Sequence, residues 1–333
     1  MEERILTVAT DCSGIEAPLQ ALDKMGIKYR HIFSSDIDKK CQQFINRAFK
    51  PEKLWSDIKE RDNKQYEGVP VDLYVAGFPC QAFSTLGFKM GFSDVDKGTI
   101  FYNVWDFIDH NRPTVFVLEN VKGLVTHNKG ETFKIIMDAL HEFSEYSIQY
   151  KLLNAMDYGL PQSRNRVFIV GIKTDYMSAP FEWPTPISMP PIEDFLDLSL
   201  PSDLFTAKNR LRYQWLSEKF PQHNFEEELW VVFFGVNKPS WVYAGKQGVC
   251  PTLVTTGEFV ITNHQRWITM EERFKLQGMD FNKYDYGGLG KTALYRMSGN
   301  TMALNVLIAI FKQIFISLSP ADEMEDVEEW SIV

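Results

Sequence analysis

One cysteine of the sequence stands where open α/β sheets carry their reactive groups. The apolar run at 71–76 leads directly into Gly77, Phe78, Pro79 and Cys80, which predicts a strand followed by a loop at its carboxyl end. Glycine permits close backbone approach and proline stiffens the turn, while nearby amide donors or cations would favour the thiolate. Cys80 is therefore a candidate nucleophile, with a buried small hydrophobic side chain as the alternative.

A carboxylate and two arginines follow other predicted strands. The apolar run at 114–118 ends at Glu119, and Arg164 and Arg166 open a later strand. Extended backbone would project the two arginines to one face, where their guanidinium groups could hold a phosphate or orient the carboxylate. The alternatives are a helix cap or a surface carboxylate for Glu119, and a surface ion pair for either arginine.

The first strand ends carry residues suited to a nucleotide-like ligand. Gly14 allows a ligand to approach the backbone at the start of a helix, although the full Gly-x-Gly-x-x-Gly pattern is absent. Asp36 follows the second strand, where a Rossmann-like site places the acid that binds ribose hydroxyls. Asp57 and Ile58 offer a carboxylate and an apolar side chain to an adenine. Each aspartate could instead cap a helix.

The hydrophobic pattern predicts the sheet that must position these residues. Short apolar runs alternate with amphipathic segments through the first half of the chain, which predicts a Rossmann-like, doubly wound, mostly parallel sheet with helices on both faces. Strands are expected at 5–10, 30–34, 71–76, 114–118, 147–153 and 166–172. Helices are expected at 17–25, 39–49, 99–109, 131–143, 269–277 and 303–316. The last two strands suit an antiparallel edge.

The sequence changes character along the chain. Residues 176–268 contain many prolines and aromatic residues and no strand-helix alternation, which predicts a smaller inserted domain. Residues 1–175 would form the main α/β domain and 269–320 would return to it. The acidic tail at 321–333 would be a solvated, frayed end.

Composition excludes several classes of protein. With 333 residues, 44% hydrophobic and 24% charged, the chain can bury a large core, which excludes disordered, collagen-like and disulfide-stapled proteins. Four cysteines without a Cys-x-x-Cys pair indicate neither a zinc site nor a disulfide framework, so no metal is expected. The formal charge is −9, with six acidic residues in the tail, and it neither supports nor excludes nucleic acid.

Neither a membrane span nor a signal peptide is expected. The longest apolar stretch, at 302–316, is interrupted by Lys312 and Gln313 and is shorter than the roughly 20 residues that a span needs. The first residues lack the basic flank, apolar run and cleavage site of a signal peptide. We therefore expect an intracellular protein, cytoplasmic or nuclear according to the organism.

Taken in order, these segments resemble the DNA cytosine-5 methyltransferase family outside residues 176–268. Gly-Phe-Pro-Cys-Gln at 77–81 looks like the family's catalytic-loop motif, Glu-Asn-Val at 119–121 like its ENV motif, and Gln-x-Arg-x-Arg at 162–166 like its QxRxR motif. Further matching segments, in the same order, are 153–159, 273–278 and 299–301. The ordered set is specific, whereas no single motif would suffice.

The resemblance implies a covalent mechanism. Carbon 5 of cytosine is too electron-poor to attack a methyl donor, so Cys80 would first add to carbon 6 as a thiolate. Glu119 would hydrogen-bond ring nitrogen 3 and so stabilise the charge that develops on the ring. The remaining implied roles are support of the loop and the site by Gln81 and Asn120, and positioning of Glu119 and of the base or its phosphate by Arg164 and Arg166.

The resemblance also implies S-adenosylmethionine as the methyl donor, bound across the first turn. The expected contacts are Ser13 and Gly14 at its methionine end, Asp36 on the ribose hydroxyls, Ile37 against the adenine ring, Asp57 and Ile58 reading the adenine, and Gly77 and Asn300 completing the pocket. The chain departs here from the family pattern Phe-x-Gly-x-Gly-Gly, because Cys12 stands for the phenylalanine and Glu16 and Ala17 replace the glycine pair.

The implied partner is double-stranded DNA, bound by a monomer. Residues 176–268 would be the target-recognition domain, with Pro-Thr-Leu at 251–253 resembling an element often found there. This segment carries seven basic against ten acidic residues, so phosphate contacts must come from a clustered subset, for which Lys208, Arg210 and Arg212 are the candidates. The target cytosine would be extruded from the duplex, because a stacked base cannot be reached.

Three other functions are open at this point. An RNA cytosine-5 methyltransferase of the tRNA-methylating branch would look alike in its catalytic domain, although its Cys-Phe-Thr signature is not found in the second domain. A non-catalytic member that binds S-adenosylmethionine or DNA is opposed by the joint presence of Cys80, Glu119 and both arginines. A thiol hydrolase would need a histidine partner for Cys80, which the six scattered histidines do not obviously provide.

Overall fold

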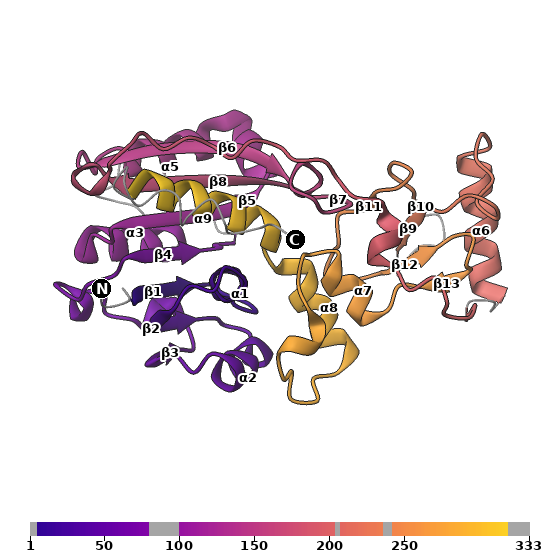
Figure 1. Ribbon diagram of the computed structural model, residues 1–333, viewed down its shortest axis with the longest axis horizontal. Helices are drawn as coiled ribbons and strands as arrows, with labels where there is room; N and C mark the ends of the chain where they lie inside the picture. The colour runs from indigo at the N-terminus through magenta and orange to yellow at the C-terminus, as the bar shows by residue number, and fades with distance from the viewer. Residues whose placement is uncertain (1–4, 80–99, 204–206, 236–241, 319–333) are drawn as a thin grey trace. The chain divides into compact units, whose positions relative to one another are not determined.

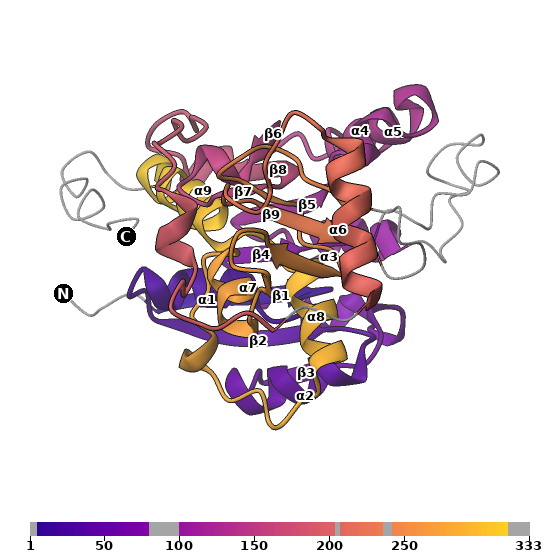
Figure 2. The same cartoon turned by 90° about the vertical axis from the view of Figure 1, so that its right-hand side faces the viewer.

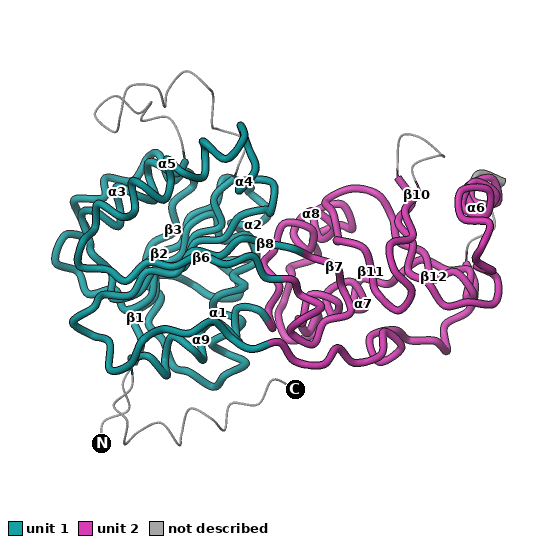
Figure 3. The backbone as a smooth tube through the Cα atoms, turned by 90° about the horizontal axis from the view of Figure 1, so that it is seen from above, with its two compact units in different colours: residues 1–153, 165–185, 306–333 teal, residues 154–164, 186–305 magenta. Residues whose placement is uncertain are grey.

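The structure, a computed structural model, describes residues 5–79, 100–203, 207–235 and 242–318. The chain divides into two compact units, which Figure 3 distinguishes by colour. Unit 1 contains residues 1–153, 165–185 and 306–333, and unit 2 contains residues 154–164 and 186–305.

Unit 1 is built on a seven-stranded sheet with the order β3-β2-β1-β4-β5-β8-β6 (Figure 1). Its strands are β1 Leu6–Asp11, β2 Tyr29–Ser35, β3 Lys53–Trp55, β4 Leu73–Ala76, β5 Val115–Val121, β6 Tyr146–Asn154 and β8 Asn165–Lys173. The first five pair in parallel, and β8 runs antiparallel to β5. The predicted mostly parallel sheet is confirmed.

Helices cover both faces of this sheet. They are α1 Ala17–Lys24, α2 Lys39–Ala48, α3 Ile100–Asn111, α4 Gly123–Thr126, α5 Glu131–Leu140 and α9 Leu304–Leu318. Figure 3 shows α3 and α5 on one face and α1 and α9 on the other. Strands covered on both sides are buried along their length, as are the four residues of β4 and residues 115–118 of β5.

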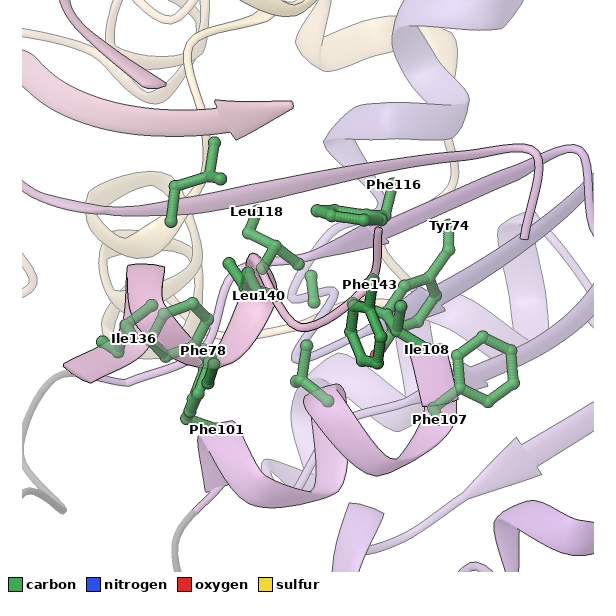
Figure 4. Packing of buried hydrophobic residues seen from close by; sticks show 14 of the residues in the cluster. Tyr74, Phe78, Phe101, Phe107, Ile108, Phe116, Leu118, Ile136, Leu140 and Phe143 are labelled. Carbon is green, nitrogen blue, oxygen red and sulfur yellow. The ribbon is translucent and has the colours of Figure 1, made fainter. Parts of the chain in front are cut away.

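Aromatic side chains fill the core between the sheet and the face covered by α3 and α5 (Figure 4). Tyr74, Phe116 and Leu118 from the strands pack in one cluster with Phe101 and Phe107 from α3, and each of these residues is at most 2% exposed. Removal of this apolar surface from water is the main force that holds the strands in place. The same strands end at the candidate site.

Phe116 faces a glycine across the strand pair. The antiparallel register of β5 and β8 places Phe116 opposite Gly171, and a Cβ atom on Gly171 would lie 2.1 Å from Phe116 Cζ. Because Phe116 is fully buried in a close-packed core, its ring has no free volume into which to move. The absence of a side chain at position 171 is therefore a packing requirement.

Unit 2 combines a four-stranded sheet, in the order β10-β9-β12-β13, with the parallel pair β7 and β11. Its strands are β7 Gln162–Ser163, β9 Val231–Phe234, β10 Val242–Tyr243, β11 Cys250–Pro251, β12 Glu258–Ile261 and β13 Arg266–Trp267. Its helices are α6 Ala207–Lys219, α7 Met270–Lys275 and α8 Lys291–Asn300. Tyr213 and Leu216 of α6 share a buried cluster with Phe234 of β9, and Figure 2 shows α6 beside β9.

Short 3₁₀ helices connect these elements. They are η1 Ile58–Glu60, η2 Asn63–Tyr66, η6 His127–Gly130, η7 Ala155–Asp157, η8 Thr174–Tyr176, η9 Ile192–Phe195 and η10 Phe281–Lys283. One helical stretch of the described residues, Lys291–Leu318, is long and apolar enough to cross a membrane by composition, but 72% of its most apolar window is buried inside the structure, as in a core helix.

The limits of the two units differ from the predicted domain limits at 176 and 268. Residues 154–164 and 269–305 belong to unit 2. Side chains at 162 and 164 hydrogen-bond backbone groups of that unit. The role of residues 176–268 in target recognition stays a prediction. The acidic tail at 321–333 lies outside the described residues.

We predict that Gly171→Ala destabilises the protein by about 2 kcal/mol, because the added methyl group overpacks the core against Phe116. Urea-induced unfolding followed by circular dichroism measures this change. Gly123→Ala is the matched control, since a Cβ there would meet only Val121 Cγ2, at 4.0 Å. Equal unfolding free energies for the two variants would contradict the packing requirement.

Candidate active site

The parallel register brings four strand ends to one edge of the sheet in unit 1. Asp11 of β1 pairs with Ser35 of β2 and with Ala76 of β4, and Ala76 pairs with Leu118 of β5. The residues that follow these positions therefore emerge side by side at the carboxyl end of the sheet, where open α/β sheets bind their ligands. These residues are Ser13, Gly14, Asp36, Gly77 and Glu119.

Glu119 and Arg166 form an ion pair at this edge. Arg166 Nε lies 3.0 Å from Glu119 Oε1, and the two side chains are only 14% and 10% exposed. The pair crosses from β5 to β8, whose antiparallel register places Arg166 opposite Val121. A guanidinium in this position fixes the orientation of the carboxylate through a charge-assisted hydrogen bond. The structure thus brings together two of the predicted site residues.

Asn120 holds the start of the predicted catalytic loop. Its Nδ2 atom donates to the carbonyl oxygen of Phe78 at 2.7 Å, and its Oδ1 atom accepts from the backbone N–H of Val121. On the other side, the backbone N–H of Gly77 donates to the carbonyl of Asp11 at 3.2 Å. The two bonds anchor the chain just before position 80. Cys80 and Gln81 themselves lie outside the described residues.

Arg164 has contacts that the sequence did not predict. It lies between β7 and β8 and binds three backbone carbonyls within unit 2: Nη1 donates to Leu253 at 3.1 Å, and Nη2 donates to Gly299 at 3.0 Å and to Thr301 at 2.6 Å. Arg164 precedes β8, which begins at Asn165. The two arginines of the motif belong to different units, Arg164 to unit 2 and Arg166 to unit 1.

Gln162 and the 251–253 segment complete this arrangement in unit 2. Gln162 Nε2 donates to the carbonyl of Leu276 at 2.8 Å, and its Oε1 accepts from the backbone N–H of Leu253 at 3.1 Å. Thr252 Oγ1 donates to the carbonyl of Ser163. The motif residue Gln162 is thus a structural tie. Asn300, a predicted cofactor contact, is the last residue of α8 and is exposed.

Asp36 joins the first turn to the start of α2. Its Oδ2 accepts from the backbone N–H of Gly14 and its Oδ1 from that of Asp38, both at 2.8 Å. Burial is the largest influence on this carboxyl and raises its pKa, against these two hydrogen bonds. Each carboxylate oxygen retains a second lone pair, so both can also accept from hydroxyl groups.

The other predicted cofactor residues lie in different environments. Ser13 Oγ is 2.6 Å from Ser34 Oγ and donates to the carbonyl of Ser35. Ile37 is 77% exposed. Asp57 caps η1 by accepting from the backbone N–H of Lys59, which was the alternative prediction for this residue. Ile58 is 4% exposed and packs into the core, so its side chain offers little surface to an adenine.

Glu16, which replaces a family glycine, turns into the protein. It adopts a left-handed backbone conformation with φ 54°, which favours glycine and costs a larger residue about 1 kcal/mol. Its carboxyl is fully buried and accepts hydrogen bonds from Thr10 and Ser34. The side chain therefore fills a polar space between β1 and β2.

Burial also shifts the pKa values of Glu16 and His31. Desolvation raises the pKa of Glu16 to about 7 and lowers that of His31, whose Nε2 lies 3.9 Å from Glu16 Oε1, to about 4. His31 is therefore neutral near pH 7 and gives the carboxyl no opposing charge.

Arg212 is not available for the phosphate contact that the sequence suggested. It is 5% exposed, its Nη2 donates to the carbonyl of Gly235 at 2.8 Å, and its guanidinium lies over the ring of Phe234. Arg212 thus lies on the buried side of α6, and the sequence pattern did not show that this side packs against β9. Arg210 is exposed, and the side chain of Lys208 lies outside the described residues.

Among the residues that the structure describes, no group of three or more His, Cys, Asp or Glu side chains could hold a metal ion.

A protein-family model described as C-5 cytosine-specific DNA methylase matches residues 11–316. The chain belongs to this family. The ordered motifs predicted that the chain is a cytosine-5 DNA methylase, and this prediction is confirmed. Methylation of cytosine at carbon 5 in DNA is accordingly the activity of this chain.

Two curated relatives resemble this methylase along most of their length. The type II methyltransferase M.Bsp6I of Bacillus sp. (strain RFL6) is 33% identical over 305 residues, which cover 87% of this chain and 92% of the relative. The type II methyltransferase M.HaeII of Haemophilus aegyptius is 31% identical over 294 residues, which cover 88% of each.

Solved structures of low sequence identity share the methylase fold. A putative DNA modification methyltransferase encoded within a prophage of E. coli superposes with a TM-score of 0.67 at 19% identity, covering 94% of this chain and 99% of that one. DNMT2 of Spodoptera frugiperda superposes with a TM-score of 0.68 at 16% identity, covering 93% and 99%. The predicted fold class is thereby confirmed.

We predict that Glu16→Gln removes a pH dependence from the stability of this methylase. Because the pKa of Glu16 is raised from 4.5 to about 7 in the folded state, its stabilising contribution is fully present below pH 4.5 and is lost as the pH rises through 7. The unfolding free energy of the variant relative to the wild type should therefore increase by about 2 kcal/mol between pH 5 and pH 8.

Urea unfolding at a series of pH values measures this difference, with the exposed Glu67→Gln as control. Stability curves of wild type and Glu16→Gln that stay parallel across this range would show that Glu16 is charged in the fold at neutral pH.

Proposed function

We propose that this methylase transfers a methyl group from S-adenosylmethionine to carbon 5 of a cytosine extruded from double-stranded DNA, through a covalent bond between Cys80 and carbon 6. One observation carries the proposal. Asn120 binds the carbonyl of Phe78, two residues before Cys80, while the adjacent Glu119 is held by Arg166. Cys80 and Glu119 follow paired strands at one edge of the sheet. A nucleophile and a carboxyl group in this arrangement suit a reaction in which the first attacks a ring and the second donates a proton to it.

In the proposed reaction, Cys80 acts as the nucleophile and Glu119 stabilises the charge that forms on the ring. The Cys80 thiolate adds to carbon 6, and the electron pair displaced from the 5,6 double bond makes carbon 5 nucleophilic. Glu119 shares a proton with ring nitrogen 3 and so stabilises the negative charge that the addition creates. After methylation, loss of the carbon-5 proton and departure of the Cys80 thiolate restore the aromatic ring.

Several features of unit 1 fit S-adenosylmethionine. The turn at 12–14 exposes backbone at positive φ values beside the Asp36 carboxylate, which can accept from ribose hydroxyls. The exposed Ile37 offers an apolar surface for the adenine. When bound, this cofactor supplies a methyl group on a sulfonium, which is a good leaving group. Gly77, one residue beyond the paired end of β4, adjoins the same turn through its bond to Asp11.

We propose further that the enzyme acts as a monomer on DNA inside the cell. A single extruded base occupies a single active site, so one subunit suffices. Target recognition would fall to unit 2, with Arg210 on the exposed side of α6 as a candidate phosphate contact.

The first experiment measures transfer of labelled methyl from S-adenosylmethionine to mixed duplex DNA and, in parallel, to total RNA, followed by bisulfite sequencing of the labelled nucleic acid. We expect label in DNA at a short recurring sequence, and none with Cys80→Ser. The wild type should also form a covalent adduct with DNA that contains 5-fluorocytosine, and the variant should not.

The other results have definite meanings. Label in RNA alone would favour the RNA methyltransferase alternative. A Cys80→Ser variant with unimpaired transfer would eliminate the covalent mechanism, and cofactor binding without transfer to either nucleic acid would favour a non-catalytic binding protein.

We predict that Arg166→Gln lowers kcat at least tenfold, because Glu119 loses the charge that orients it. The affinity for S-adenosylmethionine, measured by calorimetry, should stay within about twofold, since Arg166 is assigned to the base and not to the cofactor. Arg112→Gln is the control, because it removes a half-exposed ion pair with Asp109 and Glu145. A kcat as high in Arg166→Gln as in the control would refute this role.

A further inference from the structure

A fully buried ion pair lies beneath the candidate cofactor turn. Arg61 Nη1 and Nη2 bind Asp11 Oδ1 and Oδ2, each at 2.6 Å, and neither side chain is exposed. A pair of two parallel hydrogen bonds fixes orientation as well as distance. Removing both charges from water is costly, and apolar side chains of equal volume often serve stability as well. The position of this pair therefore calls for an explanation other than stability.

Asp11 is the point at which three strands meet. It is the last residue of β1, and its carboxylate also accepts hydrogen bonds from Ser35 of β2 and Tyr74 of β4. Its carbonyl accepts from the N–H of Gly77, at the start of the predicted catalytic loop. The turn with Ser13 and Gly14 follows directly. The position of Asp11 thus determines where the methionine end of the proposed cofactor site lies.

Arg61 belongs to the segment assigned to the adenine end. Its backbone N–H donates to the carbonyl of Ile58 at 3.3 Å and closes η1, the short helix that Asp57 caps. Its guanidinium is held from the other sides as well: Nε donates to Asn63 Oδ1 at 2.6 Å, and its Cζ lies 4.2 Å from the ring centre of Phe33. Together with the bonds to Asp11, these contacts hold the guanidinium from several sides.

We propose that Arg61 is a positioning residue for S-adenosylmethionine, which sets the distance between the adenine-end segment at Asp57 and the methionine-end turn at Ser13 by clamping Asp11. The proposal rests on the proposed function, which places the cofactor at the turn with Ser13, and on the adenine contact that the family resemblance implies for Asp57. A ligand that spans two segments binds tightly only when both are already at the right separation. Arg61 makes no contact with cytosine in this scheme, so its loss acts on cofactor binding.

The test compares Arg61→Lys and Arg61→Gln with the wild type. Lysine keeps the charge without the two-pronged geometry, and glutamine removes both. We expect the Kd and KM for S-adenosylmethionine to rise at least tenfold in Arg61→Gln and by a smaller factor in Arg61→Lys. The kcat at saturating cofactor and the KM for DNA should stay within about twofold, which a general loss of folded structure would not produce.

Arg30→Gln is the matched control. Arg30 forms an ion pair of 2.7 Å with Glu52 in the same unit, but the two side chains are 55% and 53% exposed, and cofactor affinity should not change. Tyr74→Phe is the second variant in case the Arg61 variants do not fold. It removes the hydrogen bond to Asp11 Oδ2 and leaves the ion pair, and it should raise the cofactor Kd about threefold.

The outcomes separate this proposal from the proposed function. A wild-type protein that binds no S-adenosylmethionine would overturn both. Tight binding by the wild type together with unchanged affinity in the folded Arg61 variants, or in Tyr74→Phe if those do not fold, would overturn the positioning role alone. A fall of kcat in Arg61→Gln at saturating cofactor, as large as the rise of the cofactor Kd, would also overturn the positioning role, because the residue would then act on catalysis.

Discussion

The register of the parallel strands is the constraint on which the candidate site depends. Ser35, Asp11, Ala76 and Leu118 lie level across β2, β1, β4 and β5. A slip of one residue in any pair would turn alternate side chains to the opposite face. Between β5 and the antiparallel strand β8 the register is also fixed by packing, since Phe116 fits only where Gly171 stands opposite. Packing far from the chemistry thus fixes the geometry of the chemistry.

Polar groups at this edge are held by different means according to their burial. Asp11 is paired with Arg61 and accepts hydrogen bonds from two hydroxyl groups, and it is fully buried. Glu16 accepts hydrogen bonds from the hydroxyl groups of Thr10 and Ser34, and burial raises its pKa to about 7. Glu119, close to the predicted catalytic loop, keeps a small exposed fraction beside the Arg166 guanidinium, whose Nε lies 3.0 Å from Oε1. The edge therefore combines two fully buried carboxyl groups with a third, that of Glu119, which is accessible to a substrate.

The sequence predicted those parts of the fold that depend on local pattern. The apolar runs located β1, β2, β4 and β5, and the ordered motifs identified the family and predicted that Arg166 positions Glu119, with which it pairs. Contacts over long sequence separations were not predictable. Arg164 binds carbonyl groups that follow it by 89, 135 and 137 positions, and no periodicity reports such a partner.

Charged residues in unexpected surroundings account for the other differences. The inward direction of Glu16 follows from its left-handed backbone and from two hydroxyl groups on adjacent strands, which are visible only once the strands are assembled. Arg212 was predicted to contact phosphate, whereas the packing of α6 against β9 buries it. The pairing of Arg61 with Asp11 was not predicted, because a lone arginine after a short turn belongs to no motif.

The ties made by Gln162 and Arg164 have a consequence for how such enzymes diversify. Both side chains bind main-chain groups, at Leu253, Leu276, Gly299 and Thr301, and main-chain groups are the same whatever amino acid occupies a position. If recombination replaced a stretch of unit 2 between these residues, Gln162 and Arg164 could therefore make the same hydrogen bonds to its main chain. The side chains of the imported stretch would be free to read another sequence without compensating mutations at the anchor.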